Sequence, residues 1–258
     1  MRLYMRYFAI NLKSQMQYKA AFALTVIGRI VLAFATVAGV WFMFLRFNEV
    51  EGFTLAQVLL CTAVTSMAFS ITEVFARGFD VFHFLLGNGE FDRCLTRPRN
   101  IIYQVIASHM EFGRLGILIQ AIGVLCYAVP NSGVTWTWDR ILTLVLMISC
   151  GALVFTGLYV IHAAVAFFTV EGLEFMNILT HGGREFGRYP YSVYSQGILR
   201  FLTFIVPLAL IQYYPLLYLL GIETNSFYML IPLLSLFFLL PSYAFFRIGL
   251  RRYKSTGS

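Results

Sequence analysis

Long runs of apolar residues, separated by short polar segments, extend along almost the whole chain. Each run is about 20 residues or longer, which is roughly the length that a helix needs to cross the hydrocarbon core of a bilayer. A buried helix of a soluble protein rarely stays apolar on all sides over such a length. The pattern therefore predicts six membrane-spanning helices, near residues 20–44, 55–75, 102–129, 141–168, 198–220 and 228–246.

Composition supports an all-α polytopic membrane protein. The 258 residues are 59% hydrophobic and 12% charged, whereas soluble domains carry roughly 25% charged residues. Three of the four cysteines, Cys61, Cys126 and Cys150, fall within apolar runs and Cys94 lies in a basic loop, so neither a disulfide framework nor a metal cluster is predicted. His109 and His162 are isolated from clusters of carboxylates or cysteines, which also argues against a metal site.

Lys and Arg residues gather on one side of the predicted spans. Cytoplasmic loops of membrane proteins carry an excess of these residues, and the bias sets the orientation. The opposite loops contain only Arg46 and Arg140. The basic residues of the N-terminal segment, the two long loops and the tail are Arg2, Arg6, Lys13, Lys19, Arg77, Arg93, Arg97, Arg99, Arg184, Arg188, Arg200, Arg247, Arg251, Arg252 and Lys254. We therefore expect both termini and both long loops in the cytoplasm, and the net charge of +7 does not indicate nucleic acid.

Residues 1–19, which precede the first span, alternate apolar and basic side chains. Tyr4, Phe8 and Leu12 recur at helical spacing, with Arg6 and Lys13 between them. An apolar stripe with a basic face is typical of a helix that lies in the headgroup plane of a membrane. The alternative is a frayed extension of the first span. The chain is accordingly divided into an amphipathic helix (1–19), a six-helix membrane domain (20–247) and a basic tail (248–258).

The loop 87–100, between the second and third spans, contains a short amphipathic stretch. Gly87-Asn88-Gly89 is a turn signal, and Arg97-Pro98 closes the stretch. Phe91 and Leu95 are four residues apart and share a helix face, while Glu90, Asp92 and Arg93 are expected to face water. Such a unit is suited to placing its apolar pair in a groove on a soluble partner. The spacing fits an ordinary polar loop equally well.

Two stretches resemble a known family. Residues 89–98, GEFDRCLTRP, are similar to the G-x-(F/L)-D-x-x-L-x-R-P stretch of the ABC-2 type permeases of bacteria. Residues 188–221 resemble a second signature of these permeases, with Arg-Tyr-Pro before the fifth span and paired prolines within it. The six spans and the N-terminal amphipathic helix also match, so the resemblance covers essentially the whole chain.

The resemblance implies a fold like that of type V exporters, in the bacterial inner membrane. It implies that two permease chains, identical or related, assemble with two copies of a separate ABC ATPase, and that residues 1–19 form an elbow helix. ATP and Mg²⁺ would then bind the partner, which agrees with the lack of G-x-x-x-x-G-K-[ST] in this chain. No catalytic or metal site is expected here. The contact with the ATPase, through a coupling helix in the loop 87–100, would comprise Glu90, Phe91, Asp92, Arg93, Leu95, Arg97 and Pro98.

Prolines interrupt the fifth apolar run. Pro207 and Pro215 each remove a helical hydrogen bond at membrane depth, and neighbouring protein groups must compensate for it. The resemblance implies short re-entrant helices between the fifth and sixth spans, within residues 207–226, with Tyr213 and Tyr214 near their start. A kinked but continuous helix is the alternative.

Charged residues within spans are costly in lipid and usually face a partner or a cavity. Arg29 lies in the first span, and Glu111 and Arg114, three residues apart, are expected to pair in the third. Glu73 and Arg77, four residues apart, are expected to pair near the inner end of the second. Structural pairing is favoured over contact with a substrate.

Three classes of function are compatible with six spans. The leading prediction is the permease subunit of an ATP-driven exporter, without enzymatic activity of its own. A secondary-active carrier would couple transport to ions through charged groups, and Glu111 is the best candidate, but no internal repeat is detectable. A membrane-embedded enzyme is disfavoured because no Ser-His pair, H-E-x-x-H motif or carboxylate cluster occurs.

Overall fold

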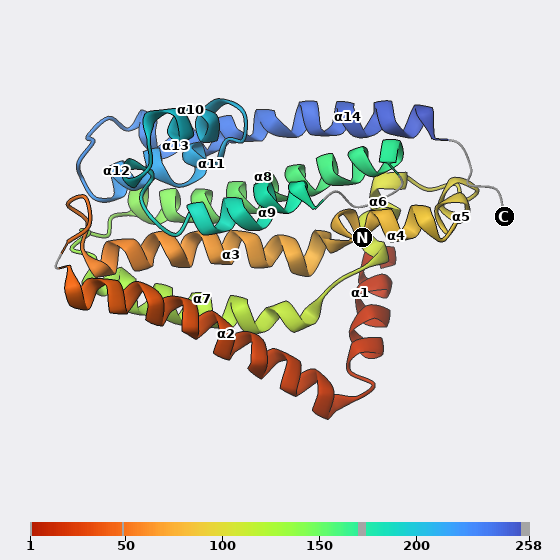
Figure 1. Ribbon diagram of the computed structural model, residues 1–258, viewed down its shortest axis with the longest axis horizontal. Helices are drawn as coiled ribbons and strands as arrows, with labels where there is room; N and C mark the ends of the chain where they lie inside the picture. Colours follow the sequence, from red (N-terminus) through yellow and green to blue (C-terminus); the bar gives the residue numbers. More distant parts are fainter. Residues whose placement is uncertain (1, 48, 170–173, 254–258) are drawn as a thin grey trace.

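The computed structural model describes residues 2–47, 49–169 and 174–253. Within these ranges the chain is helical and contains no strand, apart from an isolated bridge between Val50 and Phe53. Long helices lie side by side along one axis, with both termini at the same end of the bundle (Figure 1). Residues 254–258, the last part of the predicted tail with Lys254, lie outside the described residues.

Seventeen helical elements are described, three of them short 3-10 turns. In chain order they are α1 Arg2–Gln15, α2 Lys19–Arg46, α3 Leu55–Asp80, α4 Phe82–Gly87, α5 Phe91–Leu95, α6 Ile101–Ser108, η1 Phe112–Arg114, α7 Leu115–Asn131, α8 Trp138–Thr169, α9 Phe175–Phe186, η2 Tyr191–Val193, α10 Gln196–Phe204, α11 Leu208–Ile211, α12 Tyr213–Leu219, α13 Phe227–Leu234, η3 Ser235–Phe238 and α14 Leu239–Arg252.

Five helical stretches are long and apolar enough to cross a membrane. They are Lys19–Arg46, Leu55–Gly87, Phe112–Asn131, Trp138–Thr169 and Phe227–Arg252, and a bent pair of helices, α10 and α11–α12, is a sixth candidate. These stretches match the first, second, third, fourth and sixth predicted spans. The prediction of an all-α polytopic membrane protein is confirmed.

The N-terminal helix α1 is separate from α2. A turn at residues 16–18 divides them, and α1 leaves the bundle axis at a steep angle (Figure 1). Phe8 of α1 packs its ring against Phe75 and Phe112, with centroids 6.4 and 4.8 Å apart. The alternative of a frayed helical extension of the first span is therefore wrong.

The third predicted span, 102–129, is not one helix, and the prediction of an unbroken span is wrong. His109 is extended, at φ −141° and ψ 127°, and α7 begins only at Leu115. Gln15 of α1 compensates for the broken helical ladder, because its side chain donates to the Met110 carbonyl and accepts from the Phe112 amide. The break turns Glu111 toward arginines of α2 and α3.

The fifth predicted span, 198–220, is also broken, and a continuous helix is excluded. Helix α10 ends at Phe204, Pro207 precedes α11, and the two halves meet at an angle of 83°. Both α10 and α12 lie toward the end of the bundle opposite the termini (Figure 1). The hydroxyl of Tyr218 in α12 donates to Asp139 at the start of α8, at 2.6 Å.

Helix α9 occupies a position that the sequence assigned to a cytoplasmic loop. It lies along the middle of α3 (Figure 1), where the Arg184 guanidinium stands 5.2 Å from the ring centre of Phe69. The Thr65 hydroxyl donates to the Gly187 carbonyl at 2.8 Å, and any Cβ at Gly187 would lie 2.7 Å from Thr65. Arg184 therefore lies in a helix and Arg188 in the turn that follows it, and the expectation of a loop outside the spans is wrong, because Gly187 lets the chain approach α3.

Helix α3 is the centre of the bundle. It packs against α7 on one side and α8 on the other, and α14 packs on α8. Gly78 permits α3 to cross α6, because a Cβ there would collide with the Val105 carbonyl. Helix α2, by contrast, packs mainly on α7 and leaves its outer face exposed.

Candidate functional site

Segment 87–100 is fixed to the bundle by Phe91. The chain turns at Gly89, with φ +69°, and then forms the short helix α5. The Phe91 side chain is fully buried, and its ring meets those of Phe82, Phe167 and Tyr253 at centroid distances of 5.1, 5.5 and 5.0 Å. We call these four rings the Phe91 cluster. The expectation that Phe91 and Leu95 form one outward-facing apolar pair is wrong, because Phe91 faces its own chain.

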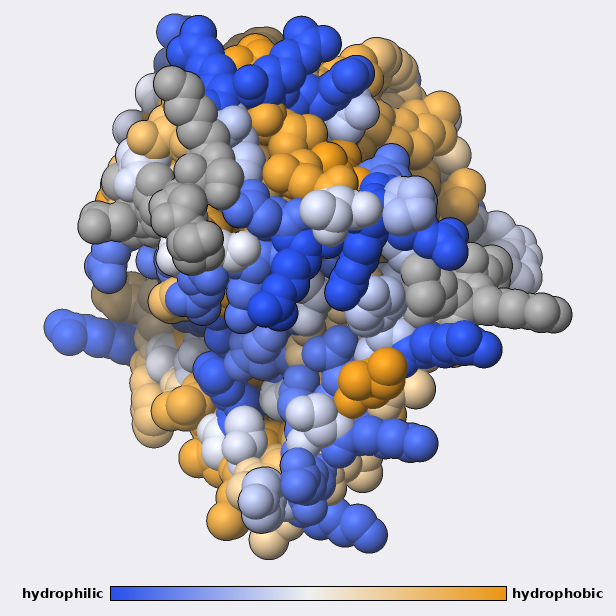
Figure 2. Space-filling model, turned by 90° about the vertical axis from the view of Figure 1, so that its right-hand side faces the viewer, coloured by the Kyte–Doolittle hydropathy of each residue, from blue (hydrophilic) through white to orange (hydrophobic). Residues whose placement is uncertain are grey.

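The rest of the segment presents an exposed surface. Leu95 is 43% exposed, and Glu90, Arg93, Arg97 and Pro98 are also exposed. Figure 2 looks at the end of the bundle that carries this segment and both termini, and hydrophilic side chains cover much of it around smaller apolar patches. One apolar side chain within a charged surface is thus what the segment offers to solvent.

Hydrogen bonds hold the segment in place on both sides of α5. Asp92 accepts from the Tyr253 hydroxyl at 3.0 Å. The Gln104 side chain donates to the carbonyls of Cys94 and Arg99, at 2.9 and 3.2 Å. Asn100 caps α6 by accepting from the Ile102 amide at 3.0 Å. The segment is therefore an ordered element and not only a connecting loop.

The thiol of Cys94 lies on the inner side of this segment. Partial burial raises the pKa of Cys94, while the positive charge of Arg97 acts in the opposite direction. Because the thiolate is the reactive form of cysteine, a raised pKa disfavours that form of Cys94.

A charged core lies behind α1, between α3, α7 and the break after α6. The predicted pairs form: Arg77 contacts Glu73 at 3.0 Å, and Arg114 contacts Glu111 at 3.1 Å. Arg114 also reaches Glu73 at 3.1 Å, and Arg29 and Arg77 both reach Glu111, at 3.2 and 3.3 Å. The two predicted pairs are thus parts of one network.

Two members of the charged core were not predicted from the sequence. Asp80 binds Arg77 at 2.9 Å and the His162 ring at 3.1 Å. The expectation that His162 is isolated from carboxylate clusters is therefore wrong, since the bundle brings it to Asp80 of the charged core, 82 positions away. Three guanidinium groups face three carboxylates in this core. Among the described residues no group of three or more His, Cys, Asp and Glu side chains is arranged to hold a metal ion.

Comparison with known proteins identifies the family to which the chain belongs. Residues 30–257 match the family model described as ABC-2 family transporter protein. The chain belongs to the ABC-2 transporter family. Neither the search of curated proteins nor that of solved structures found a match. The chain is therefore a multi-pass permease component of an ABC transporter, and this family is normally the non-catalytic membrane subunit whose partner is an ABC ATPase.

The remaining candidate residues of the permease lie at the broken helices. Pro207 immediately precedes α11, and Pro215 is in the first turn of α12, where a missing amide hydrogen costs little. Tyr213 begins α12, and the Tyr214 hydroxyl meets that of Thr203 on α10 at 3.4 Å. These contacts bring the two arms of the 83° bend together.

Proposed function

We propose that this permease forms the translocation pathway of an ATP-driven exporter, as a pair of permease chains with two separate ATPase subunits. It lies in the bacterial inner membrane with both termini in the cytoplasm. The observation that carries the proposal is the construction of α5. Its exposed face is available to a partner, while Phe91 joins its other face to the bundle.

The exposed face has the chemistry of a docking site. Leu95 supplies an apolar anchor, and Glu90, Arg93 and Arg97 supply charges around it. Anchors of this kind contribute most of the affinity of protein interfaces, while charges at a solvated rim mainly set association rate and specificity. Leu95 is accordingly the residue on which binding of the ATPase depends most.

The Phe91 cluster connects this face with the spans. Phe82 begins the short helix that continues α3, Phe167 belongs to α8, and Tyr253 follows α14. Close-packed side chains transmit displacements because protein interiors are barely compressible. A movement of α5 on the ATPase therefore reaches three spans at once.

The charge of the exposed end supports a cytoplasmic location. Arg93, Arg97 and Arg99 of the segment and Arg251 and Arg252 of α14 lie at the end that carries both termini. The positive-inside rule places such an end in the cytoplasm. The expectation that Arg200 lies in a cytoplasmic loop is also wrong, because Arg200 belongs to α10, toward the opposite end of the bundle. Without Arg184, Arg188 and Arg200 the bias remains, because Arg46 and Arg140 are the other basic residues of the opposite side.

The uncovered side of α2 supports a pair of permease chains. None of its most apolar stretch is buried, and lipid can cover the apolar part. Arg29 of the same helix pairs with Glu111, yet its side chain stays 33% exposed, and charged groups at membrane depth face protein or a water-filled path rather than lipid. A second permease chain provides that cover and completes the pathway.

The test uses the Leu95→Asp variant of the permease, co-expressed with its ATPase. The permease is then purified, and the amount of ATPase that stays bound to it is measured. Loss of an anchor of about 2 kcal/mol predicts about thirtyfold weaker binding, with ATP hydrolysis and transport falling in parallel. Ile222→Asp is the matched control, because Ile222 is 61% exposed in a turn at the opposite end. Equal retention of ATPase by both variants would contradict the proposal, as would ATP hydrolysis by the permease alone or a particle with one permease chain.

The alternative of a secondary-active carrier receives less support. Such a carrier needs a carboxylate that exchanges ions or protons, and Glu111 is bound by three arginines, Arg29, Arg77 and Arg114. An arrangement that keeps the carboxylate paired favours a structural role. Transport by the permease in vesicles with an ion gradient and no ATPase would support the carrier instead.

A further inference from the structure

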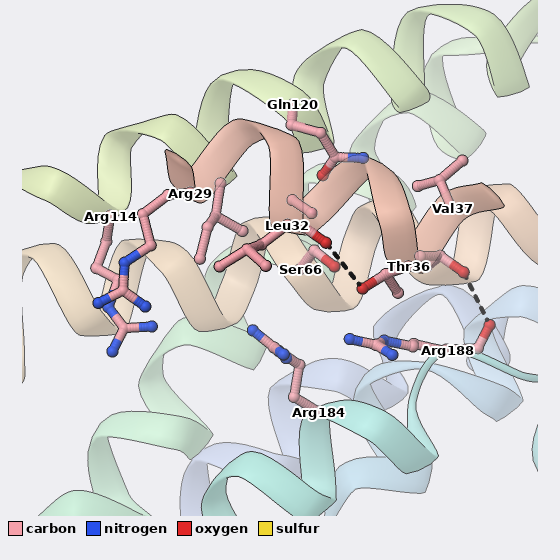
Figure 3. Close-up of a pocket in the computed structure, with 12 residues that line it drawn as sticks. Arg29, Leu32, Thr36, Val37, Ser66, Arg114, Gln120, Arg184 and Arg188 are labelled. Atoms are coloured by element: carbon pink, nitrogen blue, oxygen red, sulfur yellow. Dashed lines mark hydrogen bonds between the residues drawn. The ribbon is translucent and has the colours of Figure 1, made fainter. Parts of the chain in front are cut away.

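A cavity rich in arginine lies within the bundle, apart from α5. It is bordered by α2, α3, α7 and the chain around the end of α9, and has a volume of about 200 Å³. Arg29, Arg114, Arg184 and Arg188 line it, and no carboxylate is among its described lining residues. Figure 3 shows the guanidinium groups of Arg184 and Arg188 pointing into the space that α2 and α3 border from the other side.

The positive charge in this cavity is only partly compensated. Arg29 and Arg114 are paired in the charged core with Glu111, and Arg114 also with Glu73. Arg184 and Arg188, by contrast, share the single carboxylate of Glu185, whose side chain is 46% exposed. The wall formed by the α9 segment therefore carries an excess of one positive charge.

Donor groups in the cavity lack acceptors. Gln120 on α7 is only 5% exposed, and its amide nitrogen has no hydrogen-bond partner in the described parts of the chain. The Nε atom of Arg188 is buried and lacks one as well, as far as the described residues go. Leaving buried donors unsatisfied costs about 1–3 kcal/mol each. An acceptor entering the cavity removes this cost.

The surroundings define the class of ligand. Ser66 and Thr62 of α3, which also line the cavity, lie well within a membrane span, where an excess positive charge is costly. Leu32 and Val37 of α2 form its rim, and Leu32 is 67% exposed toward the outside of the bundle. The cavity has room for one small anionic group, and the apolar rim suits a chain attached to it.

We propose that this cavity binds the anionic group, a phosphate or a carboxylate, of an amphiphile that enters from the side of α2. Arg184 and Arg188 contact the anion with their guanidinium groups, which match the geometry of such groups, and the Gln120 amide donates a further hydrogen bond. The further step, that such an amphiphile is the substrate of the transporter, rests on the proposed function. Binding itself needs only the folded permease.

The test is binding of phosphatidic acid to the purified permease without ATPase, in detergent and in phosphatidylcholine nanodiscs. We expect phosphatidic acid to raise the midpoint of thermal unfolding, and the Arg184→Gln/Arg188→Gln variant to weaken binding at least tenfold. Arg46→Gln is the control, since it removes an exposed arginine at the C-terminal end of α2, outside the cavity lining. This variant should bind as the wild type does. If the double variant does not fold, Gln120→Leu should weaken binding several-fold while leaving the net charge unchanged.

A second arm uses inorganic phosphate as competitor. Displacement of phosphatidic acid by phosphate at millimolar concentration supports the anion site and extends it to water-soluble anions. Binding of phosphatidic acid that phosphate does not displace supports an amphiphile as the ligand. Equal binding by the wild type and the Arg184→Gln/Arg188→Gln and Gln120→Leu variants, or no preference for phosphatidic acid over phosphatidylcholine, would overturn the inference. Because no ATPase is present, a failure here is distinct from failure of the Leu95→Asp test.

Discussion

Helices α2 and α3 are both long and apolar, yet they stand in opposite relations to the bundle. Helix α2 is the more apolar, and none of its most apolar stretch is buried; for the stretch through α3 and α4 the buried share is 78%. Hydropathy thus identifies contact with the membrane and does not identify the core. The less apolar helix is central because its polar groups require partners.

The polar groups of the two helices are used differently. Thr65 and Thr72 of α3 donate to carbonyls of other segments, those of Gly187 and Ala152, at 2.8 and 2.7 Å. Thr25 and Thr36 of α2 donate only within their own helix, as far as the described residues show. Helices inside a membrane gain little from apolar burial against one another, so hydrogen bonds and close packing select their neighbours.

The largest expected difference between the helices concerns charge. Glu73→Gln on α3 removes a fully buried carboxylate that Arg77 and Arg114 share, and breaking a buried ion pair costs about 3–5 kcal/mol. Arg29→Gln on α2 removes a partly exposed member of the same network and should cost about 1 kcal/mol or less. Unfolding of both purified variants in detergent measures the comparison, and equal losses would show that α2 is as central as α3.

A smaller difference is expected from added volume. Gly78→Ala on α3 places a methyl group against the Val105 carbonyl of α6, and overpacking of this kind costs typically about 1–3 kcal/mol. Gly28→Ala on α2 meets no atom within 4 Å and should leave stability unchanged or slightly raised, because alanine favours helix. The thermal unfolding midpoint should therefore fall in Gly78→Ala and should stay the same or rise slightly in Gly28→Ala. Loss of stability in Gly28→Ala would reveal a neighbour of α2.

The smallest effect is expected from single hydroxyl groups. Thr72→Val on α3 deletes the hydrogen bond to Ala152, and such bonds between membrane helices contribute about 0.6 kcal/mol on average. Thr36→Val on α2 deletes only a bond within the helix, to the Leu32 carbonyl at 3.4 Å, and should have no measurable effect. A double-mutant cycle with Glu73→Gln separates the hydroxyl contribution from that of the charged core.

Features that depend on local spacing could be predicted from the sequence. Apolar run length indicates most of the spans, and separations of three and four residues give the Glu111–Arg114 and Glu73–Arg77 pairs. The same local rules fail for Phe91. Its helical spacing with Leu95 indicates a shared face, but a helix as short as α5 is oriented by what it packs against.

Features that depend on the path of the chain could not be predicted. Asp80 and His162 meet because α3 and α8 pack together, and no pattern in either segment records the other. Arg184 and Arg188 look like loop residues because the run around them is polar. Their positions depend on Gly187 and Thr65, a contact between segments more than a hundred residues apart.

The hydrogen bond between Tyr253 and Asp92 fixes where the described chain ends in relation to α5. A polypeptide joined genetically after this point would start beside α5, and a short flexible linker would hold it within reach of the exposed face at millimolar effective concentration. A tag of even moderate size at this end would therefore compete with any protein that binds Leu95. The turn around Ile222, at the far end of the bundle, is the place where a label leaves that surface open.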